Sequence, residues 1–146
     1  MNIFRSKFNI SKNSYKNINS DAIDIDFSIG EIKLVNFENI KNDAIDFSGS
    51  KVTVNESYFK NVNDKIISAG EESIIKVLKI SAQDSHAGIV SKDGSKVFSD
   101  NINFDGVSIP FAAYQKKGEY DYGSLIVKNY NLKNFHTKWL KDKGSN

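Results

Sequence analysis

Two aspartates stand at matching positions of two similar segments of this chain. Asp24 lies in the segment Asp21–Ile25, and Asp46 lies in the segment Asp43–Phe47, 22 residues further on. If such segments are neighbouring strands of a parallel sheet, their backbones lie about 4.8 Å apart. Carboxylates at that distance repel one another unless a cation, a lysine or a shared proton relieves the repulsion. The pair is therefore the sharpest indication of chemistry in the sequence.

Three roles are open for this carboxylate pair. Asp26 is the next outward residue, so oxygens of Asp24, Asp26 and Asp46 can form a Ca²⁺ site. The pair can instead perform acid–base catalysis, with Lys92 as a third catalytic candidate on the same face. In the third alternative the aspartates are solvated or paired with Lys65 and carry no activity. We expect no required cofactor, and Ca²⁺ is the one metal that these residues favour.

Two reactions fit a catalytic pair on such a face. Glycoside hydrolysis uses two carboxyl groups whose pKa values differ. β-Elimination from a uronic acid uses a cation that neutralises the substrate carboxylate and a base, for which Lys65, Lys92 and Tyr114 are candidates. The only arginine, Arg5, lies outside this face, and no motif specific to a lyase family is present. Whether the chain is an enzyme therefore stays open at this point.

A substrate-binding role is expected for side chains around an insertion in the last repeat. Residues 115–123 make this loop several residues longer than its counterparts, and such extra loop residues often serve binding. Tyr114 and Tyr120 can stack on sugar rings, while Lys65, Lys116 and Lys117 can bind anionic groups. The alternative is a solvated loop whose tyrosines lie against the neighbouring coil.

These residues need a scaffold, and an internal repeat predicts one. Similar segments begin at positions 21, 43, 64, 87 and 109, and a fixed period of this length is typical of a solenoid whose coils must stack. Within each repeat the apolar residues alternate, which predicts strands, and three short strands fit each period. Taking Ile23, Ile45 and Ile66 as inward, we expect one outward column to run through Asp24, Asp46 and Ile67.

The repeat resembles a known family. Its basis is the succession of the segments Asp43–Ser50, Asp64–Glu71, Gly88–Ser95 and Ala112–Lys117. This succession resembles bacterial right-handed parallel β-helix repeat proteins of the pectate-lyase-like superfamily. The resemblance implies an all-β, right-handed parallel β-helix of about 22 residues per coil and about 5–6 coils. It also favours an extracellular or cell-surface location, although the superfamily includes lyases, hydrolases, epimerases, phage tailspikes and non-catalytic modules.

Composition limits the remaining possibilities. With 146 residues, we expect a single domain over 1–140, with 135–140 as a C-terminal closing segment and 141–146 as a disordered tail. The net charge of +2 does not favour nucleic acid as a partner. The absence of cysteine excludes disulfides and thiol chemistry. No apolar stretch is long enough for a membrane span and none reads as a secretory signal, so we expect a soluble chain.

Two functions follow from these observations. In the first, the chain is a carbohydrate-contacting β-helix module that binds or modifies an acidic polysaccharide on the aspartate-bearing face. In the second, it is a non-catalytic structural or assembly module that packs on another chain or domain, as a homo-oligomer or within a larger parent protein. A ligand site predicts convergent polar groups on a concave face, whereas assembly predicts an apolar patch at an end of the solenoid.

Overall fold

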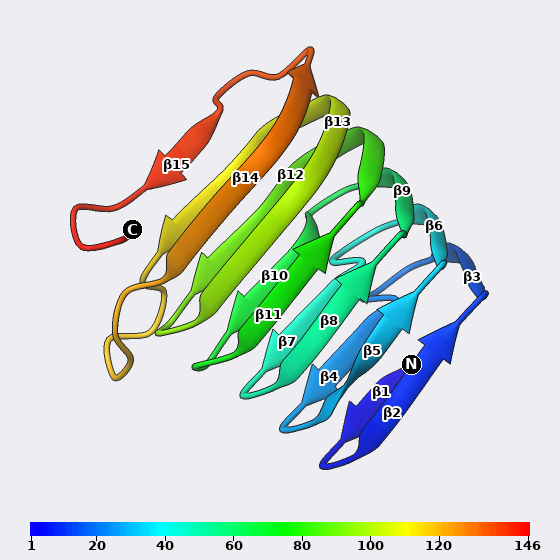
Figure 1. The fold of residues 1–146 in the computed structure, drawn as a ribbon, viewed down its shortest axis with the longest axis horizontal. Helices are drawn as coiled ribbons and strands as arrows, with labels where there is room; N and C mark the ends of the chain where they lie inside the picture. The colour runs from blue at the N-terminus through cyan, green and yellow to red at the C-terminus, as the bar shows by residue number, and fades with distance from the viewer.

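The alternating apolar residues form parallel strands that wind into a solenoid. The computed structural model describes all 146 residues, Met1–Asn146, as 15 β-strands without a helix. Successive coils stack along one axis, with the two termini at opposite ends (Figure 1). The prediction of an all-β parallel solenoid with about 22 residues per turn is confirmed. No part of the chain forms a long apolar helix of the kind that crosses a membrane.

Three sheet faces make up each coil. The first face is formed by β1 (Asn2–Phe4), β4 (Ile23–Asp26), β7 (Ile45–Ser48), β10 (Lys65–Gly70), the C-terminal parts of β12 (Ser81–Lys92) and β13 (Lys96–Tyr114), and β15 (Trp139–Lys141). The second is formed by β2 (Lys7–Ser11), β5 (Ile29–Lys33), β8 (Lys51–Asn55), β11 (Ile74–Leu78) and the N-terminal parts of β13 and β14 (Ser124–Lys133). The third is formed by β3 (Ser14–Ile18), β6 (Asn36–Ile40), β9 (Tyr58–Val62) and parts of β12, β13 and β14.

Inward side chains stack in columns that run along the solenoid axis. On the first face Ile23, Ile45, Ile67, Ile89 and Phe111 pair in sequence, coil to coil, and all five are fully buried. Because no coil can bury its apolar side chains alone, this stacking supplies the core of the protein.

An aromatic column stacks on the third face. The ring centroids of Tyr15 and Phe37 lie 5.3 Å apart, and those of Phe37 and Phe59 lie 4.8 Å apart with nearly parallel rings. Ring stacking of this kind adds to the free energy gained by burial. The aromatic column therefore fixes the register of the first three coils.

Two ladders of hydrogen bonds, one of serines and one of asparagines, connect neighbouring coils. At the corner between the first and second faces, the backbone N–H of Ser28, Ser50 and Ser73 each donates to the hydroxyl of the serine one coil further on, at 3.0–3.1 Å. On the outside, the Asn61 amide donates to Asn39 at 2.7 Å, and Asn39 donates to Asn17 at 2.9 Å. Buried backbone donors at a corner need such partners, so the ladders stabilise one coil spacing.

The last segment continues the solenoid. Residues 135–140, expected to close the C-terminal end, contribute β15, which pairs in parallel with β13 through Phe111–Trp139. Residues 141–146, expected to be disordered, turn back so that the Leu125 N–H donates to the Asn146 carbonyl at 2.6 Å. The end of the core beneath β14 and β15 is consequently left open.

Phe37→Ala is expected to lower the free energy of unfolding by about 3–5 kcal/mol, because it leaves a cavity between two stacked rings in the fully buried core. Urea unfolding followed by circular dichroism measures this loss. Phe4→Ala is the control, since Phe4 is an exposed side chain at the N-terminal end. Equal losses from the two variants would contradict the stacked column as a source of stability.

Candidate functional site

The predicted acidic column forms on the outer side of the first face. Asp24 on β4 pairs with Asp46 on β7, and Asp26 pairs with Ser48. The structure therefore brings the two predicted catalytic aspartates to neighbouring positions on adjacent strands. Burial raises the pKa of Asp24, and the negative charges of Asp26 and Asp46 raise it further. The mutual repulsion expected from the sequence is thus present.

The register of the third repeat differs from the expectation by one residue. Asp46 pairs with Ser68 rather than with Ile67, because Ile67 faces inward between Ile45 and Ile89. Ile66, which was expected to be the inward residue, is also fully buried, directly before Ile67 on β10. The outer column consequently runs through Asp24, Asp46, Ser68, Val90 and Ala112, and sequence reasoning missed Ser68.

Lys92 brings positive charge to this column. Its side chain lies over Gly70, where a Cβ atom would stand 3.4 Å from the lysine Cε. The Lys92 Nζ atom reaches to 3.7 Å from Asp46 Oδ1, although Lys92 is only 9% exposed. A side chain at position 70 would crowd this path, so glycine there keeps it open for the lysine. Lys92 thereby offsets the charge of Asp46.

Two buried polar atoms of this cluster have no hydrogen-bond partner. They are Asp46 Oδ1 and Ser68 Oγ, which belong to paired residues of neighbouring coils. Leaving a buried donor or acceptor without a partner costs about 1–3 kcal/mol. The Asp46–Ser68–Lys92 cluster, named for these three residues, therefore has unused capacity for hydrogen bonding.

Lys65 lies apart from this cluster, at the edge of the first face. Its ammonium donates to Asp43 Oδ1 at 3.0 Å and to Asp64 Oδ2 at 2.5 Å. Burial lowers the pKa of Lys65, but the hydrogen bonds and charges of Asp64 and Asp43 outweigh it, so the pKa is raised. Lys65 is therefore held as a cation by two carboxylates. Its charge is thus paired within the protein.

Tyr114 covers the apolar end of the same face. It pairs with Lys92 across β12 and β13 and packs against Ala87, Val90 and Ala112. Burial raises the pKa of its phenol, which therefore stays protonated at neutral pH. Beside it lies a cavity of about 110 Å³, whose lining includes Lys65 and His86. This volume is small compared with the pockets of about 300–1,000 Å³ that usually enclose ligands.

The inserted loop is fixed to the coil below it. Lys96 on β13 pairs with Ser124, 28 positions on, whereas Ile74 pairs with Lys96, 22 positions on, so the loop contains six extra residues. The backbone N–H groups of Lys116 and Lys117 donate to Asp93 Oδ1 at 2.6 and 2.7 Å. This buried carboxylate, which sequence reasoning missed, thus anchors the base of the loop. The sequence did contain a signal for Asp93, because it lies 22 residues, one repeat period, after Glu71.

The predicted substrate-binding residues of the loop have different environments. Lys117 forms an ion pair with Glu71, and this hydrogen bond raises the pKa of its ammonium. The Lys116 side chain is exposed and forms no ion pair. Tyr120 is half-buried, and its carbonyl accepts a hydrogen bond from Gln115 at 2.5 Å. Of the predicted lysines, only Lys116 presents an uncompensated charge.

The proposed Ca²⁺ ligands form an incomplete set. Asp24, Asp26 and Asp46 share one face, but no group of three or more aspartate, glutamate, histidine or cysteine side chains is arranged to hold a metal ion. Asp46 instead faces Lys92, and a lysine ammonium competes with a cation for the same oxygen. A Ca²⁺ ion at Asp46 would therefore share the carboxylate with the Lys92 ammonium group.

A second candidate site is the open C-terminal end of the solenoid. Three aromatic side chains are exposed there: Tyr130 (42%) and Trp139 (38%), which continue inward columns, and Phe135 (43%). The partners of Tyr130 and Trp139 one coil earlier, Ile102 and Phe111, are at most 1% exposed. Tyr130 pairs with Ile102 and Trp139 pairs with Phe111, while Phe135 lies two residues beyond the end of β14.

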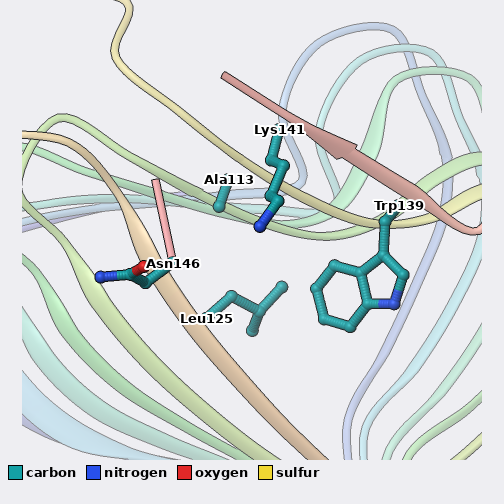
Figure 2. Close-up of a pocket in the computed structure, with 5 residues that line it drawn as sticks. All are labelled: Ala113, Leu125, Trp139, Lys141 and Asn146. Atoms are coloured by element: carbon teal, nitrogen blue, oxygen red, sulfur yellow. The ribbon is translucent and has the colours of Figure 1, made fainter. Parts of the chain in front are cut away.

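This end is hollow. A cavity of about 320 Å³ opens there between β14 and β15, lined by Leu125, Trp139, Ala113, Lys141 and Asn146. Figure 2 shows Trp139 and Leu125 at the border of this space, with the Lys141 side chain extending toward it. The opening is the exposed cross-section of the core. Comparisons with protein-family models, with curated proteins and with solved structures found no match to this chain.

Asp24→Asn is expected to raise the melting temperature at pH 7. Because the pKa of Asp24 is raised in the folded state, its ionisation lowers stability at every pH above that folded-state pKa. The gain is expected to fade as the pH falls below the usual aspartate pKa of about 3.9, where the carboxyl group is protonated in both states. Thermal unfolding by circular dichroism across this pH range measures it. Asp121→Asn, at an exposed loop position, is the control, and a gain that persists in acid would contradict the repulsion.

Proposed function

We propose that this chain is a non-catalytic assembly module whose C-terminal end packs against another polypeptide. The observation that carries the proposal is the exposure of Tyr130 and Trp139 at positions that the middle coils bury, with Phe135 also exposed in this coil. Large exposed apolar groups gathered at one place are typical of interaction surfaces. A polypeptide that continued these columns would complete the core.

The backbone at this end also favours a polypeptide partner. β14 and β15 pair with a strand only on the side of β13. On the outer edge of β14 the Leu125 N–H donates to the Asn146 carbonyl, and the rest of the outer edges has no neighbouring strand. An added strand can pair with such an edge, and side-chain pockets then supply specificity. The cavity beside Trp139 is one such pocket. Together these features fit a strand-forming partner better than a small molecule.

The environments of the lysines on the predicted polysaccharide-binding face also favour assembly over polysaccharide binding. Lys65 pairs with Asp43 and Asp64, Lys92 pairs with Asp46, and Lys117 pairs with Glu71. A polyanion would have to displace an internal carboxylate from each of them. Charge already compensated within the protein contributes little to binding a further anion.

A photo-crosslinking residue at position 130 is expected to form one defined adduct with a polypeptide in the cells of origin. Tyr130 continues an inward column and faces the open end, so a docked partner lies against it. The adduct is measured by its mass on denaturing gels and by peptide sequencing. Further replacement of Trp139 by serine should weaken the adduct at least about tenfold, since a buried aromatic anchor commonly supplies more than about 1.4 kcal/mol of binding free energy.

The matched control places the same crosslinking residue at position 126. Ile126 lies on the same strand and is more exposed than Tyr130, but it pairs with Phe98 in an outward column. Adducts of equal yield from both positions, or none from position 130, would overturn the assembly proposal.

A second candidate function is a carbohydrate-contacting face, and the Asp46–Ser68–Lys92 cluster favours it. Asp46 Oδ1 and Ser68 Oγ lack partners in the protein and are buried, so a sugar hydroxyl group would donate to the first and accept from the second only after a neighbouring side chain moves aside. Tyr114, Tyr120 and Lys116 would then contact the remainder of the sugar chain. Whether such a face only binds a polysaccharide or also modifies it depends on the acid–base behaviour of Asp24 and Asp46.

If this second function holds, uronic-acid or neutral polysaccharides should raise the melting temperature, because a ligand that binds only the folded state stabilises it. A thermal-shift titration that also includes Ca²⁺ measures the effect. The increase should be lost in Asp46→Ala and kept in Lys76→Ala, a change on the second face. No shift with any polysaccharide would count against the carbohydrate reading and leave the assembly proposal standing.

A further inference from the structure

Charge is segregated along the solenoid. The N-terminal coil, 1–20, contains Arg5 and three lysines and no acidic residue. The central part, 21–123, contains 11 lysines against 17 aspartates and glutamates, and the C-terminal coil, 124–146, contains five lysines against one aspartate. The overall charge of +2 conceals this pattern. Both ends are thus basic, and the middle is acidic.

The basic residues of the C-terminal coil are uncompensated. They are Lys128, Lys133, Lys138, Lys141 and Lys143. None of them forms an ion pair, in contrast to Lys65 and Lys92 of the first face. Lys128 lies over the Phe98 ring and Lys138 over the Tyr130 ring, at 5.7 and 4.5 Å from the ring centroids.

One of these lysines occupies a core position. Lys141 pairs with Ala113, an inward and fully buried residue of β13. Its side chain therefore extends toward the cavity of the open end, as Figure 2 shows. A partner that covered this cavity would bury the ammonium group, and a buried charge needs an opposite charge.

We infer that the open C-terminal end accepts a strand-forming polypeptide with an acidic end coil, and that the basic N-terminal coil prevents copies of this chain from stacking on one another head to tail. This inference rests on the proposed assembly function and names its partner. A polypeptide is favoured over other polyanions because only a polypeptide offers backbone groups to the free edges of β14 and β15. Carboxylates on that partner would meet Lys141 and the surrounding lysines.

Head-to-tail stacking is the arrangement that this charge pattern opposes. The N-terminal coil has the same three-strand cross-section, since β1, β2 and β3 begin the columns that β15 and β14 end. Its inward residues Ile3, Phe8 and Tyr15 are only partly buried. Shape and apolarity alone would therefore allow an open chain of copies. Placing one basic coil on another opposes it, since like charges brought together suppress the wrong partner.

The test reverses the charge of the C-terminal end. The variant Lys128→Glu/Lys133→Glu/Lys141→Glu converts the four-charge excess of this coil to an acidic one and makes it complementary to the basic N-terminal coil. At about 0.01 M salt, where charges act over about 30 Å, we expect sedimentation velocity to show dimers and longer oligomers. Self-association should be at least about tenfold tighter than that of the unmodified chain, a difference of about 1.4 kcal/mol, and should be lost at about 1 M salt.

The matched control reverses three exposed lysines of the second face, Lys51→Glu/Lys76→Glu/Lys96→Glu, and should stay monomeric. The double variant Lys128→Glu/Lys133→Glu leaves the cavity lysine in place and serves if the triple variant does not fold. If the unmodified chain associates as strongly as the variant, the basic coils do not prevent head-to-tail stacking and the inference is overturned. That result would leave the proposed docking of a polypeptide at this end unaffected. If neither reversed variant associates, the inference fails, and the crosslink from position 130 separately decides whether the end docks a polypeptide.

Discussion

Stacking of one coil on the next is the interaction on which the rest of this structure depends. A single coil of three short strands has only one layer of inward side chains, so it gains a core only from its neighbours. The columns through Ile23 and Ile45, and through Phe37 and Phe59, exist only between coils. The serine and asparagine ladders are likewise formed between coils. The spacing of the coils, the core and the hydrogen bonds at the corners therefore all depend on the same contact, which is repeated between neighbouring coils.

The need for a neighbouring coil also determines where core residues become exposed on the surface. A column that is buried in every middle coil must end, and the residue at its end meets solvent unless something covers it. At the C-terminal end these residues are aromatic and are surrounded by unpaired lysines, one of which lies in the core cavity. Lys65 and Lys92 on the first face are, by contrast, paired with aspartates of other coils. The charges of Lys65 and Lys92 are therefore compensated within the protein, whereas the lysine charges of the C-terminal coil are not.

The first face shows how far local sequence could predict a site. The 22-residue spacing placed Asp24 beside Asp46, because an exact repeat fixes which residues of adjacent coils pair. The spacing did not predict the register at Asp64-Lys65-Ile66-Ile67, because either isoleucine could be the inward residue of the alternating apolar pattern. The coil contacts decide: Ile67 continues the column of Ile45, and Lys65 reaches Asp43. Ser68, and with it the polar cluster beside Lys92, followed only from that register.

The sequence by itself determined the architecture, because period and alternation are local properties that any coil displays. It also identified Lys92, Lys117 and Tyr114 as residues on one side of the solenoid. Only the tertiary structure showed that the charges of Lys92 and Lys117 are paired, since their partners, Asp46 and Glu71, each lie 46 residues away in the chain. It alone showed that Trp139 extends the core without closing it, because burial of that ring depends on the presence of a further coil, which no local pattern reports.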